Sequence, residues 1–91
     1  MKYDVEFSDE DNLYSAFVNN KRICKTCSCM SYLSSTHVLV NYSNGTCEVY
    51  DLSGKLCDSF YAYSRPDRLS SGLLAYIDEE DHLILKEWND L

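Results

Sequence analysis

The stretch KRICKTCSCMS, residues 21–31, places three of the chain's five cysteines within six positions. Cys24 and Cys27 have the C-x-x-C spacing of zinc knuckles and redox pairs, and Cys29 follows two residues later. Structural zinc takes four ligands, usually from two such knuckles that are each formed by a tight turn. No glycine or proline bends this stretch, and in a continuous strand Cys24 would face one side while Cys27 and Cys29 face the other. We therefore treat the three cysteines as weak metal candidates and expect no bound metal.

The rest of the chain adds little to a thiol site. A fourth zinc ligand would have to be an isolated side chain, namely Cys47, Cys57, His37 or His82. A redox pair has its first cysteine at a helix N-terminus, which lowers the thiol pKa, and no helical pattern follows CKTC. An odd number of cysteines also argues against a closed disulfide framework. The sequence predicts reduced thiols that pack as small apolar side chains, and no cofactor.

Motifs for catalysis are not found in the sequence. Both of its histidines lie at the starts of predicted strands, where side chains are usually exposed. There is no G-x-S-x-G, no glycine-rich phosphate loop and no H-E-x-x-H. Fifteen carboxylates allow some acid–base pair to be drawn in any fold, so their number alone indicates no reaction. We expect a protein that is not an enzyme.

Turn signals divide the chain into short segments rich in β-branched and aromatic residues. Three stretches follow the order strand, polar turn, strand: LYSAFVNNKRICKT, HVLVNYSNGTCEVYD and LLAYIDEEDHLILKEW. They predict a mainly β single domain over residues 1–91, an antiparallel sheet of consecutive hairpins arranged as a meander or as a small barrel or sandwich. One short helix is an alternative over residues 9–18, where Ser8 is a suitable N-cap, or over residues 65–71.

The best-defined element is the hairpin around Asn44-Gly45, because both residues tolerate the positive φ of a tight turn. With these two residues as the loop, Val40 lies opposite Val49. One face would then be apolar throughout and the other polar, as in a half-buried antiparallel pair. The apolar face would carry Val38, Val40, Tyr42, Cys47 and Val49, and the polar face Asn41, Ser43, Thr46 and Glu48.

Charge is unevenly distributed along this acidic chain, whose net charge is −7. Residues 1–11 carry five acids and one lysine, and residues 78–91 carry six acids and one lysine, whereas the middle has more bases than acids. In an up-and-down meander of eight strands, the SDED and DEED turns fall at the same end of the sheet. The predicted partner-binding residues of this shared rim are Asp9, Glu10, Asp11, Asp78, Glu79, Glu80 and Asp81. The alternative is that acidic turns only keep a small protein soluble.

Composition and charge narrow the function classes. The chain is 45% apolar and 13% aromatic, too much for a disordered segment. It has no apolar run that would span a membrane and no apolar signal-peptide core near its start, so we expect no membrane partner and a cytoplasmic location. Its negative charge disfavours direct binding of DNA or RNA. The same charge suits a basic partner, and the commonest basic surfaces in a cell bind nucleic acid.

In size and charge the chain resembles the inhibitors that phages and mobile elements direct against host nucleases, anti-CRISPR proteins among them. This resemblance implies a viral protein that acts through protein–protein interaction in the host cytoplasm. A second interpretation is a small accessory or homo-oligomerising β-module whose interface is apolar and rich in tyrosine. A zinc-stabilised module is a more distant third.

Overall fold

The computed structural model describes residues 3–8, 13–27 and 29–88, with side chains over 15–23 and 30–88. These residues form ten β-strands and no helix, so the predicted mainly β fold of antiparallel hairpins is confirmed. No helix that could cross a membrane occurs among them. The strands are β1 (Tyr3–Ser8), β2 (Leu13–Val18), β3 (Lys21–Cys27), β4 (Cys29–Tyr32), β5 (His37–Asn41), β6 (Thr46–Asp51), β7 (Leu56–Tyr61), β8 (Asp67–Ser70), β9 (Leu73–Ile77) and β10 (Leu83–Glu87).

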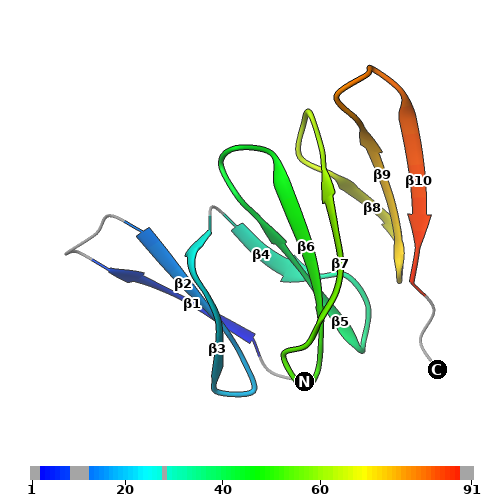
Figure 1. Ribbon diagram of the computed structural model, residues 1–91. Helices are drawn as coiled ribbons and strands as arrows, with labels where there is room; N and C mark the ends of the chain where they lie inside the picture. The colour runs from blue at the N-terminus through cyan, green and yellow to red at the C-terminus, as the bar shows by residue number, and fades with distance from the viewer. Residues whose placement is uncertain (1–2, 9–12, 28, 89–91) are drawn as a thin grey trace.

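The strands are distributed over three sheets. The first sheet has the order β1-β2-β3, the central sheet β4-β5-β6-β7, and the third sheet β10-β9-β8. Figure 1 shows them as successive layers, with the central sheet between the other two. Each of the three predicted hairpins lies in a different sheet, as β2–β3, β5–β6 and β9–β10. The single meander of eight strands is therefore wrong, because strand pairing stops after β3 and again after β7.

The inner strand β5 of the central sheet is covered on both faces, which explains its continuous apolar run Val38-Leu39-Val40. Alternate residues of β5 point to opposite sides. Val38 and Val40 join a cluster with Ala16 and Val18 of the first sheet. Leu39 joins a second cluster that includes Leu74 and Tyr76 of the third sheet. The molecule thus has two thin cores, one on each side of the central sheet.

The register of the β5–β6 hairpin differs by one residue from the prediction. Val40 lies opposite Glu48 and Leu39 opposite Val49. The cause is a loop of three residues: Tyr42 N–H donates to Thr46 O, and Gly45 N–H donates back to Tyr42 O, with Gly45 at φ 94°. One extra loop residue moves every partner by one position. The predicted all-apolar face is therefore split, with Val38 and Val40 on one side of the sheet and Cys47 and Val49 on the other.

Both helical alternatives are wrong for the residues that the structure describes. Residues 13–18 form β2, which turns through Asn19 (φ 49°) and Asn20 (φ 68°) into β3, as a two-residue hairpin requires. Residues 67–70 form β8, which pairs with β9. A proline directly before an edge strand is well tolerated because it withholds no ladder hydrogen bond, and Pro66 occupies that position.

Candidate partner-binding surface

The predicted acidic cluster at residues 78–81 forms the turn between β9 and β10. Asp78 N–H donates to His82 O over 3.0 Å, and Asp81 N–H donates to Asp78 O over 3.2 Å. Oδ1 of Asp78 accepts from the N–H groups of Glu80 and His82, each over 2.9 Å. Asp78 is thus a structural residue of the turn, whereas Glu79, Glu80 and Asp81 are exposed.

The other predicted cluster, Asp9, Glu10 and Asp11, lies outside the described residues. Its flanking strands, β1 and β2, belong to the first sheet, whereas the 78–82 turn belongs to the third. Because these turns belong to different sheets and not to one eight-stranded meander, the order of the turns does not place the two clusters on one rim. That the two clusters act together stays a prediction.

Carboxylates of the central sheet are all engaged within the protein, as far as side chains are described. Glu48 accepts from the hydroxyls of Tyr42 (2.6 Å) and Tyr50 (3.0 Å). Asp51 caps its own turn, and the hydrogen bond from the Ser53 hydroxyl, with further ones from Lys55 and Ser53 backbone N–H groups, holds its pKa below the usual value. The third carboxylate, Asp58, binds a lysine of the third sheet. Among the described side chains, the exposed carboxylates all belong to the third sheet and its turn: Asp67, Glu79, Glu80, Asp81 and Glu87.

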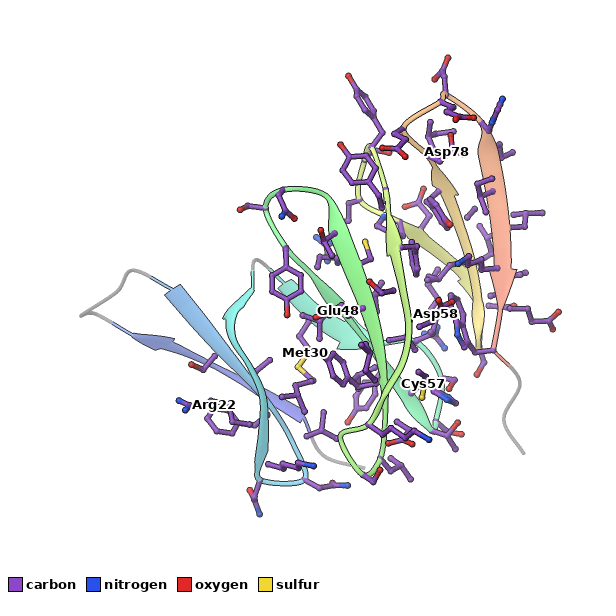
Figure 2. The ribbon with its side chains drawn as sticks, in the orientation of Figure 1. Arg22, Met30, Glu48, Cys57, Asp58 and Asp78 are labelled. Carbon is purple, nitrogen blue, oxygen red and sulfur yellow. The ribbon has the colours of Figure 1, made fainter. Side chains whose placement is uncertain are left out.

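The two permanent cations of the third sheet's described strands both reach toward the central sheet. Lys86 Nζ lies 3.3 Å from Asp58 Oδ2 and 4.7 Å from the centre of the Phe60 ring. Arg68 donates from Nε to Leu33 O over 3.0 Å. Figure 2 shows Asp58 between β7 and the third sheet, and Glu48 on the opposite side of the central sheet. Lys86 thus contacts the central sheet, and Arg68, although exposed, is bound to the loop that follows β4.

Strand pairing shows where the acids of the third sheet lie. Arg68 and Lys86 are both paired with Leu74, which is buried against the central sheet. Asp67 is paired with Ala75, and Glu87 with Leu73, on the opposite side. Paired residues of antiparallel strands share a face. The sheet therefore separates charge, with cations on its inner side and exposed carboxylates on its outer side and in its turn.

The side of the third sheet that faces away from the central sheet, here called the outer face, is aliphatic in its middle. Leu83 is 67% exposed and Leu85 61% exposed. Figure 2 shows side chains of carbon alone projecting from β10 away from the other sheets. The outer face comprises Leu73, Ala75, Ile77, Leu83 and Leu85.

Sequence reasoning missed the outer face, although a signal was present. The run Leu83-Ile84-Leu85 is continuously apolar, and a strand that is apolar on both sides is normally buried on both sides. In the structure only Ile84 packs on the core. An edge strand with this pattern indicates a surface that is made to be covered.

The cysteine-rich stretch is divided between two sheets and is not one continuous strand. Cys24 and Cys27 lie on β3 of the first sheet, and Cys29 begins β4 of the central sheet. Irregular pairing with β2 places Cys24 opposite Ala16 and Cys27 opposite Tyr14, so simple strand alternation does not apply. No three metal-binding side chains gather among residues whose side chains are described, a set that does not include these three. Absence of metal stays a prediction.

The two cysteines with described side chains differ in environment. Cys47 is buried, its Sγ–H donates to Asn41 Oδ1 over 3.1 Å, and burial raises its pKa to about 11. Cys57 is exposed, and partial desolvation, followed by the charge of Asp51, raises the pKa of its thiol. Lys55 beside Cys57 lowers the pKa of that thiol by less than desolvation and Asp51 raise it, so neither thiol is activated as a nucleophile.

One serine–histidine contact resembles a catalytic pair but caps a turn. His37 Nδ1 lies 2.9 Å from Thr36 Oγ1 and 3.3 Å from Ser34 Oγ. Ser34 is only 3% exposed, so a substrate carbonyl could not reach its hydroxyl. Two hydroxyls also share the same ring nitrogen. The other histidine, His82, is exposed in the acidic turn beside Asp78.

A tyrosine-rich cleft lies between the β5–β6 turn and the segment after β7. Its volume is about 400 Å³, and Tyr61, Tyr63 and Arg65 form part of its wall. Tyr63 is 77% exposed. The cleft contains no described cluster of acid, base and nucleophile, and its aromatic side chains suit a protein contact.

No protein family matches this chain, and no curated protein or solved structure is significantly similar to it. Function must therefore be inferred from the chain's own residues.

Proposed function

We propose that this is a non-enzymatic binding protein that occupies a basic surface of another protein through the carboxylates of its third sheet. The observation that carries the proposal is the separation of charge across that sheet. Lys86 is bound to Asp58 of the central sheet and Arg68 to Leu33 O in the β4–β5 loop, while Glu79, Glu80 and Asp81 are exposed. A surface from which cations are withdrawn attracts a basic partner and disfavours phosphate.

The partner class follows from the chemistry of basic surfaces. A concentrated positive surface on a cellular protein most often serves to bind nucleic acid. An acidic protein on that surface would compete with DNA or RNA, which is how a phage or mobile-element inhibitor of a host nuclease, an anti-CRISPR protein for example, would act. Its small size and lack of a catalytic motif fit this role.

A second candidate is an oligomerising or accessory β-module with an apolar, tyrosine-rich interface. The exposed leucines of the outer face and the exposed Tyr63 favour it. Salt separates the two functions, because a charge-driven complex weakens steeply with ionic strength and an apolar complex hardly changes.

The test compares two variants that each remove three negative charges. One is Glu79→Gln/Glu80→Gln/Asp81→Asn, which keeps Asp78 as the turn cap and keeps a residue that tolerates positive φ at 81. The matched control is Asp9→Asn/Glu10→Gln/Asp11→Asn. Each protein, immobilised, is used to capture partners from a cell lysate at low and high salt, and captured proteins are identified by mass spectrometry.

The expected result is capture of a nucleic-acid-binding protein at low salt, displaced by added DNA or RNA and lost from the 79–81 variant. Single changes should be nearly silent, since an exposed ion pair contributes about 0.2–1 kcal/mol. Loss from the control variant as well would support joint action of both clusters. Equal capture by the wild type and both variants at low salt would mean that the acidic turn does not bind the partner and serves only solubility.

A further inference from the structure

We propose that the outer face of the third sheet is the contact surface itself, and that it takes a partner element with aliphatic side chains along its middle and lysine or arginine on its flanks. A basic amphipathic helix of the partner has this chemistry. The inference rests on the proposed function and specifies the partner's surface.

The layout of the outer face is that of an interface. Its middle is aliphatic, with Leu83 and Leu85 more than half exposed. Carboxylates lie on three sides: Asp67 on the edge strand β8, Glu87 on the edge strand β10, and the 79–81 group in the turn. Stable protein interfaces have an apolar middle and a polar rim, and large apolar patches ringed by polar groups mark contact sites.

Charge decides between a second copy and a different protein. The outer face contains no lysine or arginine among the described residues, because Lys86 and Arg68 are both paired with the inward-facing Leu74. In a symmetric dimer both copies present the same face, so rim carboxylates would meet other carboxylates, with His82 of the turn as the one basic side chain among the rim residues described. Like charges placed opposite each other disfavour a complex. A partner with an aliphatic ridge flanked by cations would instead cover the leucines in the middle of the outer face and form ion pairs with the carboxylates of its rim.

The test uses a defined probe, a synthetic helical peptide of leucine and lysine with all its leucines on one side. Amide chemical shifts of the isotope-labelled protein are followed during titration with this peptide, with an all-lysine peptide and with a leucine–glutamate peptide. The key variant is Leu83→Thr/Leu85→Thr, which keeps residues that favour strands. The matched control is Leu52→Thr/Leu56→Thr, which changes two exposed leucines, one in the β6–β7 turn and one at the start of β7.

The leucine–lysine peptide should shift the amide signals of β8, β9 and β10. The Leu83→Thr/Leu85→Thr variant should bind this peptide at least about tenfold more weakly. The control variant should bind as the wild type does. Equal binding of the leucine–glutamate peptide, shifts confined to other strands, or no effect of the outer-face variant would overturn the proposal. So would a dimer through this face, detected by sedimentation and abolished by Leu83→Thr/Leu85→Thr.

Failure here is distinguishable from failure of the proposed function. If a captured basic partner depends on the 79–81 carboxylates but binds Leu83→Thr/Leu85→Thr normally, the acidic function stands and the outer face is not its contact surface. Folding of each variant is checked by its amide spectrum. The exposure of both leucines predicts an unchanged core.

Discussion

Lys86 connects the third sheet to the central sheet, and its positive charge lies on the inner side of the third sheet and not on the outer face. Its Nζ lies 3.3 Å from Asp58 Oδ2 and 4.7 Å from the centre of the Phe60 ring. Lys86→Met keeps most of the aliphatic stem and removes the charge. Paired with Asp58→Asn in a double-mutant cycle, it isolates the interaction between the two charges. Asn at 58 can still accept the 2.8 Å hydrogen bond from Ser59 N–H.

The expected magnitude follows from geometry and exposure. Unit charges 3.3 Å apart attract by about 1.3 kcal/mol at the dielectric constant of water, and by about 5 kcal/mol at an effective value of 20. Both side chains are about one third exposed, so screening and desolvation bring the net contribution toward about 1 kcal/mol. Contact with Phe60 adds about 0.5–1 kcal/mol. Lys86→Met should lower the free energy of unfolding by about 1–2 kcal/mol, with a coupling to Asp58 of about 0.5–1 kcal/mol.

Urea unfolding followed by tryptophan fluorescence measures this directly. Trp88 is the chain's one tryptophan, and its ring lies 6.1 Å from that of Phe60, beside the contact under test. The coupling energy should fall in 1 M salt, because the pair is partly screened. A coupling of zero at low salt would refute the reasoning. It would mean that Lys86 is free to neutralise the acids of the third sheet.

The acidic turn and the thiols give further outcomes. Asp78→Ala should destabilise the protein by about 1–2 kcal/mol through loss of two turn hydrogen bonds. Asp81→Gly should stabilise it by about 0.5–1 kcal/mol because residue 81 has φ 66°. Melting temperatures in the reverse order would contradict the turn geometry. Iodoacetamide at pH 8 should modify Cys57 and spare Cys47, whose pKa of about 11 and burial protect it. Equal labelling in peptide mass spectra would refute this.

The hairpins were predictable because their signals are local. Asn44-Gly45 and Asn19-Asn20 permit positive φ, and β-branched and aromatic residues flank both turns. The register of the β5–β6 hairpin was not predictable from the same turn sequence. Asn-Gly suits a two-residue loop and also the last two positions of a three-residue loop, with Gly45 at positive φ in either case. The choice between a two-residue and a three-residue loop depends on how β5 and β6 pack against the other two sheets. Those sheets are formed by residues that are distant in the sequence.

Division of the strands into three sheets also depends on distant contacts. Nothing in CKTCSCMS indicates that the chain leaves one sheet at Cys27 and enters another at Cys29. For the candidate surface, charge counting located the acidic turn at residues 78–81. It could not show that Lys86 and Arg68 face inward, since this requires the pairing of both with Leu74.

The charge separation across the third sheet is tested most directly by an association rate. Stopped-flow binding of the captured partner is measured for the wild type and for Glu79→Gln/Glu80→Gln/Asp81→Asn, from about 50 to about 500 mM salt. Steering by a summed field predicts that the wild-type rate constant falls at least about tenfold over this range. The association rate constant of the variant should be lower than that of the wild type at low salt and should fall less as salt is added. At high salt the two rate constants should be equal. Identical rate constants and salt slopes for the two proteins would contradict a contact made through these carboxylates.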